Sequence, residues 1–372
     1  MSNLIWKIRV PGKLMIAGEY AILEPKQHAI VIAVNRYITL EMKSSPENIL
    51  SWPQLGFHQL TWKCEGNKVV YSRFDSRLIY FQQAIEVMNQ YFRELSIPMG
   101  NFQIIIQSDL ADNEGRKYGL GSSAAIVVGV VASILSYNKI RLSPVEIFKL
   151  SALAHLKAQG NGSGADIAAS IFGGWIHYIA YPANWVWNQL AKGTKISDLI
   201  KQPWPNLLIT PLTAPSNLEL CVGWTKEVAR TGPMVEKIKK LRITNPYIYE
   251  CFLQASYQAV ASIAKGFETG NNRIVLEGIS LNRQALRRLG ELANVSIETT
   301  KLKTLCDEAE KFGKAKSSGA GGGDCGIAFI QHVNQKLRLH EDWIKEGIIP
   351  LNMNVSKTGL VVSELIKRNV LK

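Results

Sequence analysis

The N-terminal part of the chain alternates short apolar runs with polar turns, which is the pattern of β-strands. The runs are rich in β-branched and aromatic residues, and Gly, Pro, Asn or Asp stands at their ends. β-Branched and aromatic side chains fit a half-buried pleated surface, whereas the bounding residues favour turns. We therefore predict strands over residues 6–10, 29–42, 60–63, 68–72 and 102–108.

Apolar residues at helical spacing appear between and after these strands. Residues 78–95 show this spacing. Residues 124–135 form a continuous apolar stretch that is shorter than the roughly 20 residues of a membrane span, so we expect a buried helix there. Ser143, Pro144 and Glu146 together indicate a helix start, because serine caps the first turn and proline suits its first position.

The middle of the chain is less regular. A short helix is predicted over residues 165–172, ended by two glycines and followed by a strand over 175–180. Residues 181–211 contain several prolines and tryptophans without either periodicity, and we interpret them as a linker.

The remainder of the chain is mainly helical, with a glycine-rich segment followed at once by an apolar strand. Helices and then strands in this proportion predict an α+β fold with two lobes. The predicted helices span 233–241, 247–267, 273–289, 297–312 and 335–345, and the predicted strands span 326–330, 350–355 and 359–363.

Composition indicates an ordinary folded protein with a basic surface. Of its 372 residues, 47% are hydrophobic and 20% charged, enough apolar material for a substantial core. The net charge of +13 favours anionic partners such as phosphates, nucleic acid or anionic lipid. Because the basic residues are spread along the chain without interleaved aromatics, we expect no nucleic-acid partner.

Cysteine usage and the N-terminal sequence point to a reducing compartment. The five cysteines are odd in number and form no Cys-x-x-Cys pair, which predicts neither a disulfide framework nor a zinc site. No basic segment followed by an apolar one opens the chain, so we expect no signal peptide, no membrane partner and a cytoplasmic location. The sequence leaves the oligomeric state open.

The strongest chemical signal is the segment Lys117-Tyr118-Gly119-Leu120-Gly121-Ser122-Ser123-Ala124-Ala125, which leads into the apolar helix. A helix start exposes unpaired N–H groups, glycines allow close backbone approach, and serines add hydroxyls for phosphate or magnesium. A tight turn with a helix cap is the structural alternative. A Rossmann interpretation does not fit, because the preceding predicted strand ends about ten residues before the segment. A P-loop is also excluded, because no Walker A motif occurs in the sequence.

Two further segments share this small-residue character. The first, residues 316–326, has four glycines among positions 319–323. Ordering glycines costs backbone entropy, and this cost is easiest to explain if the loop must pass close to another group. The second, residues 11–20, places Lys13 between two glycines and among apolar residues, which suggests that its side chain faces the interior of a site. The six histidines are scattered and predict neither a metal site nor a histidine base.

Pro-Gly-Lys at residues 11–13, Gly-Leu-Gly-Ser-Ser-Ala-Ala at 119–125 and Ser-Gly-Ala-Gly-Gly-Gly-Asp at 318–324 resemble, in order and spacing, the three motifs of the GHMP kinases. This resemblance covers most of the chain. It implies a GHMP kinase nucleotide-binding domain over residues 1–195, with a mixed sheet and helices, and a C-terminal α/β sandwich lobe over 196–372. It also implies an active site in the cleft between the lobes, with ATP and Mg²⁺ as cofactors.

The resemblance also implies roles for individual residues. The catalytic set would be Lys13, Lys117 and Asp166, of which the last stands where the superfamily carries its catalytic aspartate; capping of the following helix is its structural alternative. ATP would be held by Gly119, Leu120, Gly121, Ser122, Ser123 and Ala124, with Ser122 or Ser123 nearest the metal. The acceptor would contact Tyr20, Ser163, Ser318, Gly319, Ala320, Gly321 and Gly322.

Softer marks favour the phosphomevalonate branch of the family, among them Tyr20 in Gly-Glu-Tyr-Ala and the Asp-Cys-Gly ending at 324–326. The substrate would then be phosphomevalonate, and its already ionised phosphate would leave Asp166 to orient Lys13 and the acceptor rather than to remove a proton. The segment 226–231 departs from the branch and puts the acceptor contacts of that loop in question. Mevalonate kinase, which needs a true base, and a non-catalytic ligand sensor are the alternatives.

Overall fold

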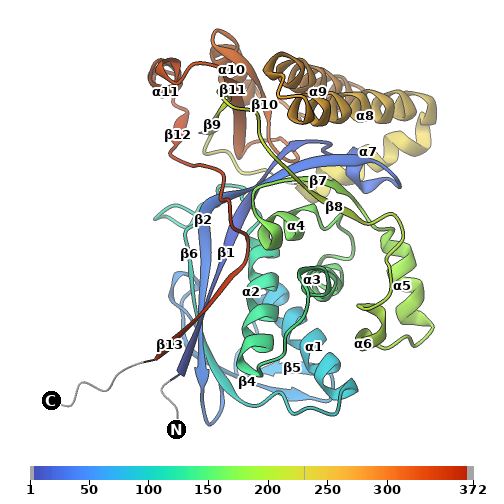
Figure 1. The fold of residues 1–372 in the computed structure, drawn as a ribbon, viewed down its shortest axis with the longest axis vertical. Helices are drawn as coiled ribbons and strands as arrows, with labels where there is room; N and C mark the ends of the chain where they lie inside the picture. The colour runs from blue at the N-terminus through green and yellow to red at the C-terminus, as the bar shows by residue number, and fades with distance from the viewer. Residues whose placement is uncertain (1–3, 230, 367–372) are drawn as a thin grey trace, which may run out of the picture.

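The computed structural model describes residues 4–229 and 231–366. Two β-sheets, each covered by helices, lie one beyond the other along the long axis (Figure 1). The larger sheet has nine strands in the order β13-β1-β2-β6-β3-β4-β5, with β7 paired to β2 and β8 to β7. The smaller has four strands in the order β10-β11-β9-β12. The predicted α+β fold with two lobes is confirmed.

Most predicted strands are present, and four further ones, β3, β8, β9 and β10, were not predicted. The strands are β1 Leu4–Ala17, β2 His28–Ser44, β3 Asn48–Trp52, β4 Phe57–Glu65, β5 Lys68–Tyr71, β6 Phe102–Ser108, β7 Trp175–Ile179, β8 Leu208–Leu212, β9 Glu219–Trp224, β10 Gly313–Ser317, β11 Cys325–Ile330, β12 Ile349–Leu351 and β13 Val361–Ile366.

Helices cover one face of the large sheet and flank the small one (Figure 1). In the N-terminal lobe, α2 and α4 contact β1 and β2, while α1 and α3 pack against α2. In the C-terminal lobe, α8 and α9 form an antiparallel pair beside β10. The helices are α1 Ile79–Glu94, α2 Ser122–Tyr137, α3 Pro144–Gln159, α4 Ala165–Phe172, α5 Ala183–Ala191, α6 Ile196–Leu199, α7 Thr231–Thr244, α8 Pro246–Glu268, α9 Asn272–Ala293, α10 Thr300–Glu310 and α11 Asn334–Lys345.

Two predicted helix features are confirmed in detail. Residues 124–135 are all buried within α2, as their continuous apolarity predicted. Ser143 caps α3 by accepting from the Glu146 N–H, and the Glu146 carboxylate accepts from the Ser143 N–H in return. This capping box satisfies N–H groups that the first helical turn would otherwise leave unpaired.

The interpretation of residues 181–211 as an irregular linker was wrong. They form α5, α6 and most of β8, which pairs with β7 in the large sheet. Pro182 is the N-cap of α5, and Pro211 lies in the edge strand β8, two positions where proline is tolerated. The division at residues 195/196 stays a prediction, and both β8 and the C-terminal β13 belong to the large sheet.

A continuous hydrophobic core joins the two lobes. Trp175 on β7 has its ring centroid 4.9 Å from that of Phe267 on α8 and 5.9 Å from that of Phe329 on β11. Buried residues of β1, β2, α2, α8, α9 and β11 belong to the same cluster. Close packing of this kind gives the lobes a fixed relation, so segments far apart in sequence can build one site.

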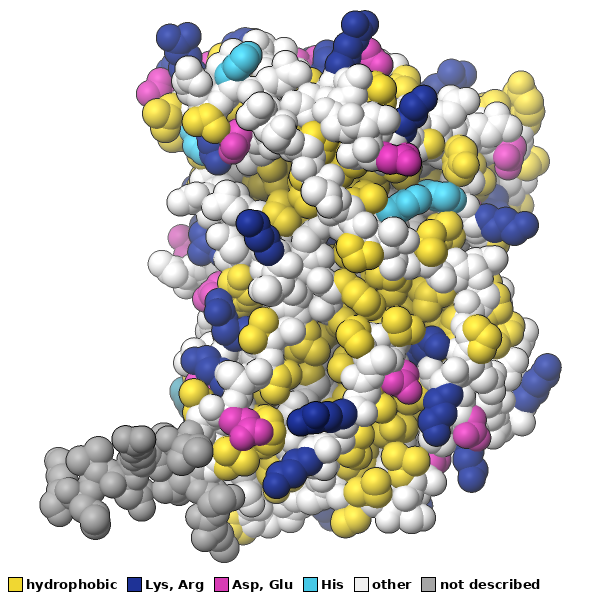
Figure 2. All heavy atoms as spheres, viewed as in Figure 1, with side chains coloured by type: hydrophobic (Ala, Val, Ile, Leu, Met, Phe, Trp, Pro, Cys, Tyr) yellow, Lys and Arg dark blue, Asp and Glu magenta, His cyan; other side chains and the backbone are white. Residues whose placement is uncertain are grey.

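Charge on the surface is mixed. On the face drawn in Figure 2, Lys and Arg side chains are scattered and interspersed with acidic ones, and no single basic stripe crosses it. Within residues 4–229 and 231–366, no helix combines the length and apolarity that crossing a membrane requires.

Candidate active site

The first motif, Pro-Gly-Lys at residues 11–13, lies inside strand β1. The sequence had suggested instead that this motif follows the strand. The strand register shifts between Pro11 and Gly12, and the Lys13 N–H donates to the Leu120 carbonyl at 2.9 Å. A Cβ on Gly12 would come within 2.9 Å of the same Leu120 oxygen. Glycine is therefore required where β1 meets residues 117–123, which we call the serine loop.

The Lys13 side chain extends along the serine loop. Its Nζ lies 3.4 Å from the Gly119 carbonyl oxygen, a long contact, and a Cβ on Gly121 would lie 2.9 Å from its Cγ. Lys13 has no carboxylate within 4 Å among the described residues, Asp166 included. Lys13 and Asp166 thus form no direct ion pair in this structure, and the orienting role of Asp166 stays a prediction.

The serine loop ends in a helix start that no side chain caps. Gly119 and Gly121 have φ values of 79° and 75°, in the left-handed region, and Gly121 is the N-cap of α2. The first helical bond runs from the Ala125 N–H to the Gly121 carbonyl, so the preceding N–H groups of α2 have no acceptor within the helix. These N–H groups and the positive end of the helix dipole suit a phosphate.

Ser123, in the first turn of α2, contacts α3. Its Oγ lies 3.3 Å from His155 Nε2, and the His155 ring packs against Tyr80 with centroids 5.1 Å apart. Ser122 lies beside it at the helix start. Lys117 is exposed and forms an isolated β-bridge with Ala111 at the entrance of the serine loop.

Asp166 lies in the first turn of α4, but Gly164 rather than Asp166 is the N-cap. One carboxylate oxygen accepts from the adjacent Ile167 N–H at 3.0 Å. Ser170 of the same helix donates to the Pro11 carbonyl at 2.9 Å, which ties α4 to the first motif. Burial, and secondarily the charge of Asp166, raises the pKa of Tyr181, whose ring lies on the same side of the site.

The predicted acceptor residues Ser163 and Tyr20 both make structural hydrogen bonds. Ser163 Oγ accepts from the Ala165 N–H at 3.3 Å, and the Ser163 carbonyl accepts from the Tyr178 hydroxyl. The Tyr20 hydroxyl donates to the Ala320 carbonyl at 2.5 Å. Burial, and secondarily Glu19, raises the pKa of Tyr20, which keeps this hydroxyl protonated as a donor.

The third motif connects β10 to β11, and we call residues 318–324 the glycine-rich loop. The Ser318 hydroxyl donates to the Met15 carbonyl at 2.9 Å. Lys316, on β10, forms a fully buried ion pair with Glu19. Together with the bond from Tyr20, these contacts fix the glycine-rich loop to residues 15–20, although about 300 residues separate the two segments in sequence.

Glycine is needed in this loop because other backbone lies close to it. A Cβ on Gly321 would lie 2.1 Å from the Ile297 carbonyl oxygen, and the Gly322 N–H donates to that oxygen at 2.8 Å. Both glycines have φ near +70°, where other residues are strained. The close neighbour that the glycine content had suggested is therefore the backbone of residues 295–297.

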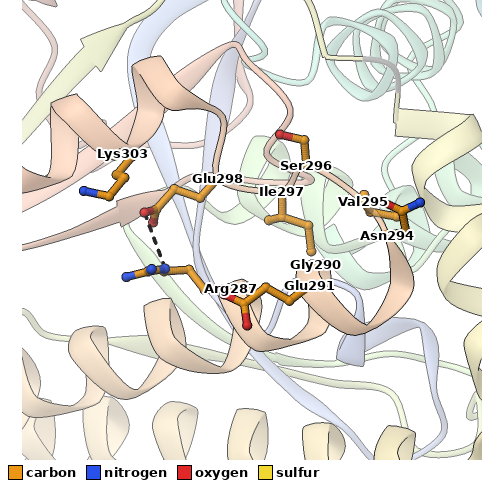
Figure 3. A pocket seen from close by; sticks show the side chains of 9 residues that line it. All are labelled: Arg287, Gly290, Glu291, Asn294, Val295, Ser296, Ile297, Glu298 and Lys303. Carbon is orange, nitrogen blue, oxygen red and sulfur yellow. Dashed lines mark ion pairs between the residues drawn. The ribbon is translucent and has the colours of Figure 1, made fainter.

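Ile297 is also part of the wall of a cavity behind the glycine-rich loop (Figure 3). The cavity has a volume of about 330 Å³ and contains none of the predicted site residues. Within it, Arg287 Nε lies 3.7 Å from a Glu298 carboxylate oxygen. Its lining residues are Arg287, Gly290, Glu291, Asn294, Val295, Ser296, Ile297, Glu298 and Lys303.

Sequence reasoning missed Asp324, the last residue of the glycine-rich loop. A Cβ on Gly119 would lie 2.7 Å from Asp324 Oδ2, so this carboxyl group sits directly over the serine loop. Burial raises the pKa of Asp324, while Lys13 and Lys117 oppose the rise. The sequence signal was its place at the end of the third motif and in the Asp-Cys-Gly ending, but no site role had been given to it.

The chain is similar to known proteins in sequence and in fold. The family GHMP kinases N terminal domain matches residues 80–174, and GHMP kinases C terminal matches residues 263–348. A phosphomevalonate kinase from Streptomyces sp. (strain CL190) is 34% identical over 370 residues, which cover 94% of this chain and 97% of the relative.

Two solved structures share the fold along almost their whole length. A Listeria innocua protein has a TM-score of 0.90 and 36% identity, covering 96% of this chain and 99% of its own. Streptococcus pneumoniae phosphomevalonate kinase, in complex with phosphomevalonate and AMPPNP, has a TM-score of 0.82 and 28% identity, covering 94% and 99%. Both family domains match, and the 34% identity to the Streptomyces phosphomevalonate kinase spans nearly the full length. The chain therefore belongs to the GHMP kinase family.

Proposed function

We propose that this chain transfers the γ-phosphoryl group of ATP to the phosphate of phosphomevalonate, giving diphosphomevalonate and ADP. The observation that carries the proposal is the meeting of an uncapped helix start, Lys13 and the glycine-rich loop at one place. Phosphoryl transfer asks a protein mainly for positioning and charge neutralisation, and these groups supply both. The end-to-end likeness to a phosphomevalonate kinase supports the choice of acceptor.

The residues of the serine loop fit the phosphates of ATP. Gly119 and Gly121 carry no side chains above the helix start, and both have the left-handed backbone that presents consecutive N–H groups to an anion. We expect Leu120 and Ala124 to contribute their backbone, since both side chains are buried.

Mg²⁺ fits the same place with few protein ligands. The described residues contain no group of three His, Cys, Asp or Glu side chains placed to hold a metal. Mg²⁺ is commonly bound by substrate phosphates, waters and one or two protein oxygens, so the hydroxyls of Ser122 and Ser123 are sufficient candidates. When bound, the ion would neutralise charge on the transferred phosphoryl group.

The acceptor side is best served by backbone of the glycine-rich loop. The hydroxyls of Ser318 and Tyr20 are already engaged with the Met15 and Ala320 carbonyls. Within the described residues, the N–H groups of Ala320 and Gly321 have no hydrogen-bond acceptor. We therefore assign acceptor binding to these N–H groups, with Ser318 and Tyr20 holding the loop in position.

An ionised acceptor shifts the emphasis from proton removal to charge. A phosphate monoester has a second pKa of about 6, so its attacking oxygen is largely deprotonated at neutral pH. The approach of two anionic reactants must then be offset by cations, a role that falls to Lys13 and Lys117. Asp166 would orient the acceptor and the lysines from α4, which Ser170 holds against the first motif.

We also propose that the reaction takes place in the cytoplasm. The five free cysteines are compatible with a reducing compartment.

A coupled assay of ADP release tests the acceptor, with phosphomevalonate and mevalonate measured side by side. The proposal predicts a kcat/KM for phosphomevalonate at least about 100-fold above that for mevalonate, because an unfilled anion site leaves buried polar groups unpaired. The opposite preference would indicate a mevalonate kinase. ATP binding without turnover of either acceptor would indicate a ligand sensor.

A further inference from the structure

The glycine-rich loop is held at two places by backbone carbonyls that lie outside it. The Gly322 N–H donates to the Ile297 carbonyl at 2.8 Å, and the Asp324 N–H donates to the Glu227 carbonyl at 2.7 Å. Between these two points Gly323 has no room for a side chain, since a Cβ there would lie 2.7 Å from the Glu227 oxygen. The path of the loop therefore depends on where these two carbonyl groups lie.

The first carbonyl belongs to the segment that joins α9 to α10. Residues 294–298 line the cavity drawn in Figure 3, so this segment has open space on one side. Atoms beside a void have no packing partners there, and contacts elsewhere must fix their position. The segment ends at Thr299, the N-cap of α10, whose hydroxyl oxygen accepts from the Leu302 N–H at 3.3 Å.

The second carbonyl belongs to residues 225–229, which follow β9 and which we call the strap. The Thr225 N–H and hydroxyl donate to the Asp324 carbonyl at 2.9 and 3.0 Å, and the Glu227 N–H donates to Thr225 Oγ at 3.2 Å. These bonds extend the pairing of β9 with β11 beyond the ends of the two strands. The strap thus follows the end of the glycine-rich loop. It also includes most of the segment in which the sequence departs from the phosphomevalonate branch.

The side chain of Glu227 connects the strap to the segment before α10. Its Oε2 accepts from the Thr299 hydroxyl at 2.9 Å, across 72 positions of sequence. The two carbonyls that hold the glycine-rich loop therefore belong to segments that are tied to each other by this hydrogen bond. Because Glu227 is exposed, the bond contributes little to the stability of the whole fold, and we looked for its effect in the shape of the loop.

We propose that Glu227 and Thr299 are positioning residues for acceptor binding, which set the shape of the glycine-rich loop through their mutual hydrogen bond. This inference rests on the proposed function, in which the N–H groups of Ala320 and Gly321 bind the acceptor phosphate. Such N–H groups hold an anion only while they converge on it, and their direction follows the path of the loop. Glu227 is unsuited to bind an anionic acceptor directly, because like charges repel, so it acts through Thr299.

The proposal predicts a split between the two substrates. Losing one hydrogen bond in Glu227→Ala should raise the KM for phosphomevalonate about 5- to 10-fold. The KM for ATP should stay within about twofold, because the serine loop holds ATP. Removing a negative charge would by itself favour an anionic acceptor, so a higher KM reports the changed shape of the loop. A purely structural role would instead lower the melting temperature and leave both KM values of the folded protein unchanged.

Steady-state kinetics and thermal unfolding of wild type, Glu227→Ala and Glu227→Gln test the inference. The glutamine amide oxygen can still accept from the Thr299 hydroxyl, so Glu227→Gln should keep a KM for phosphomevalonate within about twofold of wild type. Glu277→Ala is the matched control, because it removes an exposed carboxylate on α9 whose only listed role is an ion pair with Arg273, and it should retain wild-type kinetics.

A double-mutant cycle assigns the effect to the bond between the two side chains. In a Thr299→Val background, Glu227→Ala should change the KM for phosphomevalonate by less than about twofold, since the bond is already absent. Thr299→Ser keeps both the bond and the helix cap and should behave as wild type. The comparison of alanine with glutamine at the exposed position 227 holds even if Thr299→Val folds poorly.

Four results would each overturn the inference. They are a wild-type KM for phosphomevalonate in Glu227→Ala, an equal rise in both KM values, a Glu227→Gln variant as impaired as Glu227→Ala, and the same fold-change of Glu227→Ala in both Thr299 backgrounds. A wild-type enzyme that does not turn over phosphomevalonate refutes the proposed function itself. An active wild type with an unaltered Glu227→Ala refutes the positioning role alone.

Discussion

Replacing Lys316 by methionine should lower the free energy of unfolding by about 3 to 5 kcal/mol, because it leaves a buried carboxylate without its cation. The side chains of Lys316 and Glu19 are 0% and 1% exposed. The ammonium group also donates to the Ser317 carbonyl, while Glu19 Oε2 has no hydrogen-bond partner among the described residues. Lys316 is thus the main group that compensates the desolvation of Glu19.

Urea unfolding followed by tryptophan fluorescence measures this loss, and a double-mutant cycle assigns it. Removing both charges with Glu19→Gln and Lys316→Met should recover at least about 2 kcal/mol relative to the sum of the single changes. Lys345→Met is the matched control, because its ion pair with Asp342 is exposed and should contribute less than about 1 kcal/mol. Additive single effects would refute the reasoning, since they would mean that the two charges do not compensate each other.

Three further predictions concern the site and the surrounding fold. Lys13→Met should lower kcat more than Asp166→Asn if charge outweighs proton removal, and the reverse order in the ADP-release assay would restore a catalytic base. Gly121→Ala should lower kcat at least about tenfold because its Cβ meets the Lys13 side chain, whereas Gly193→Ala has a similar φ but open space and should not. Burial lowers the pKa of His28, so the neutral ring stabilises the fold above the ordinary histidine pKa of about 6.5, and that stability is lost as pH falls below it. His28→Gln should therefore flatten the dependence of the melting temperature on pH between about pH 7 and 5, and an unchanged slope would contradict this.

Local patterns in the sequence were enough to predict the elements that carry the site. The uninterrupted apolar run predicted the buried helix α2, and the glycines and serines before it predicted the helix start. The three motifs could also be recognised locally, and their resemblance to those of the GHMP kinases implied that they meet in one site. These features depend on a few neighbouring residues, which is why they can be recognised without tertiary information.

Contacts between distant residues could not be predicted in this way. Glu19 and Lys316 are 297 positions apart, and Lys316 had been taken as part of a loop although it lies on β10. Asp324 reaches Gly119 only because the two lobes pack against each other. Prolines misled the interpretation of residues 181–211, since the helix start and edge strand that accommodate them are defined by tertiary structure.

The central claim concerns which oxygen receives the phosphoryl group, and ³¹P NMR of the reaction products tests it most directly. With ATP, Mg²⁺ and phosphomevalonate, the account predicts that the monoester signal disappears and that a pair of coupled diphosphate signals grows in step with ADP. With ATP, Mg²⁺ and mevalonate, it predicts no new phosphorus signal beyond background hydrolysis. A new monoester formed from mevalonate, with phosphomevalonate left unchanged, would contradict the account.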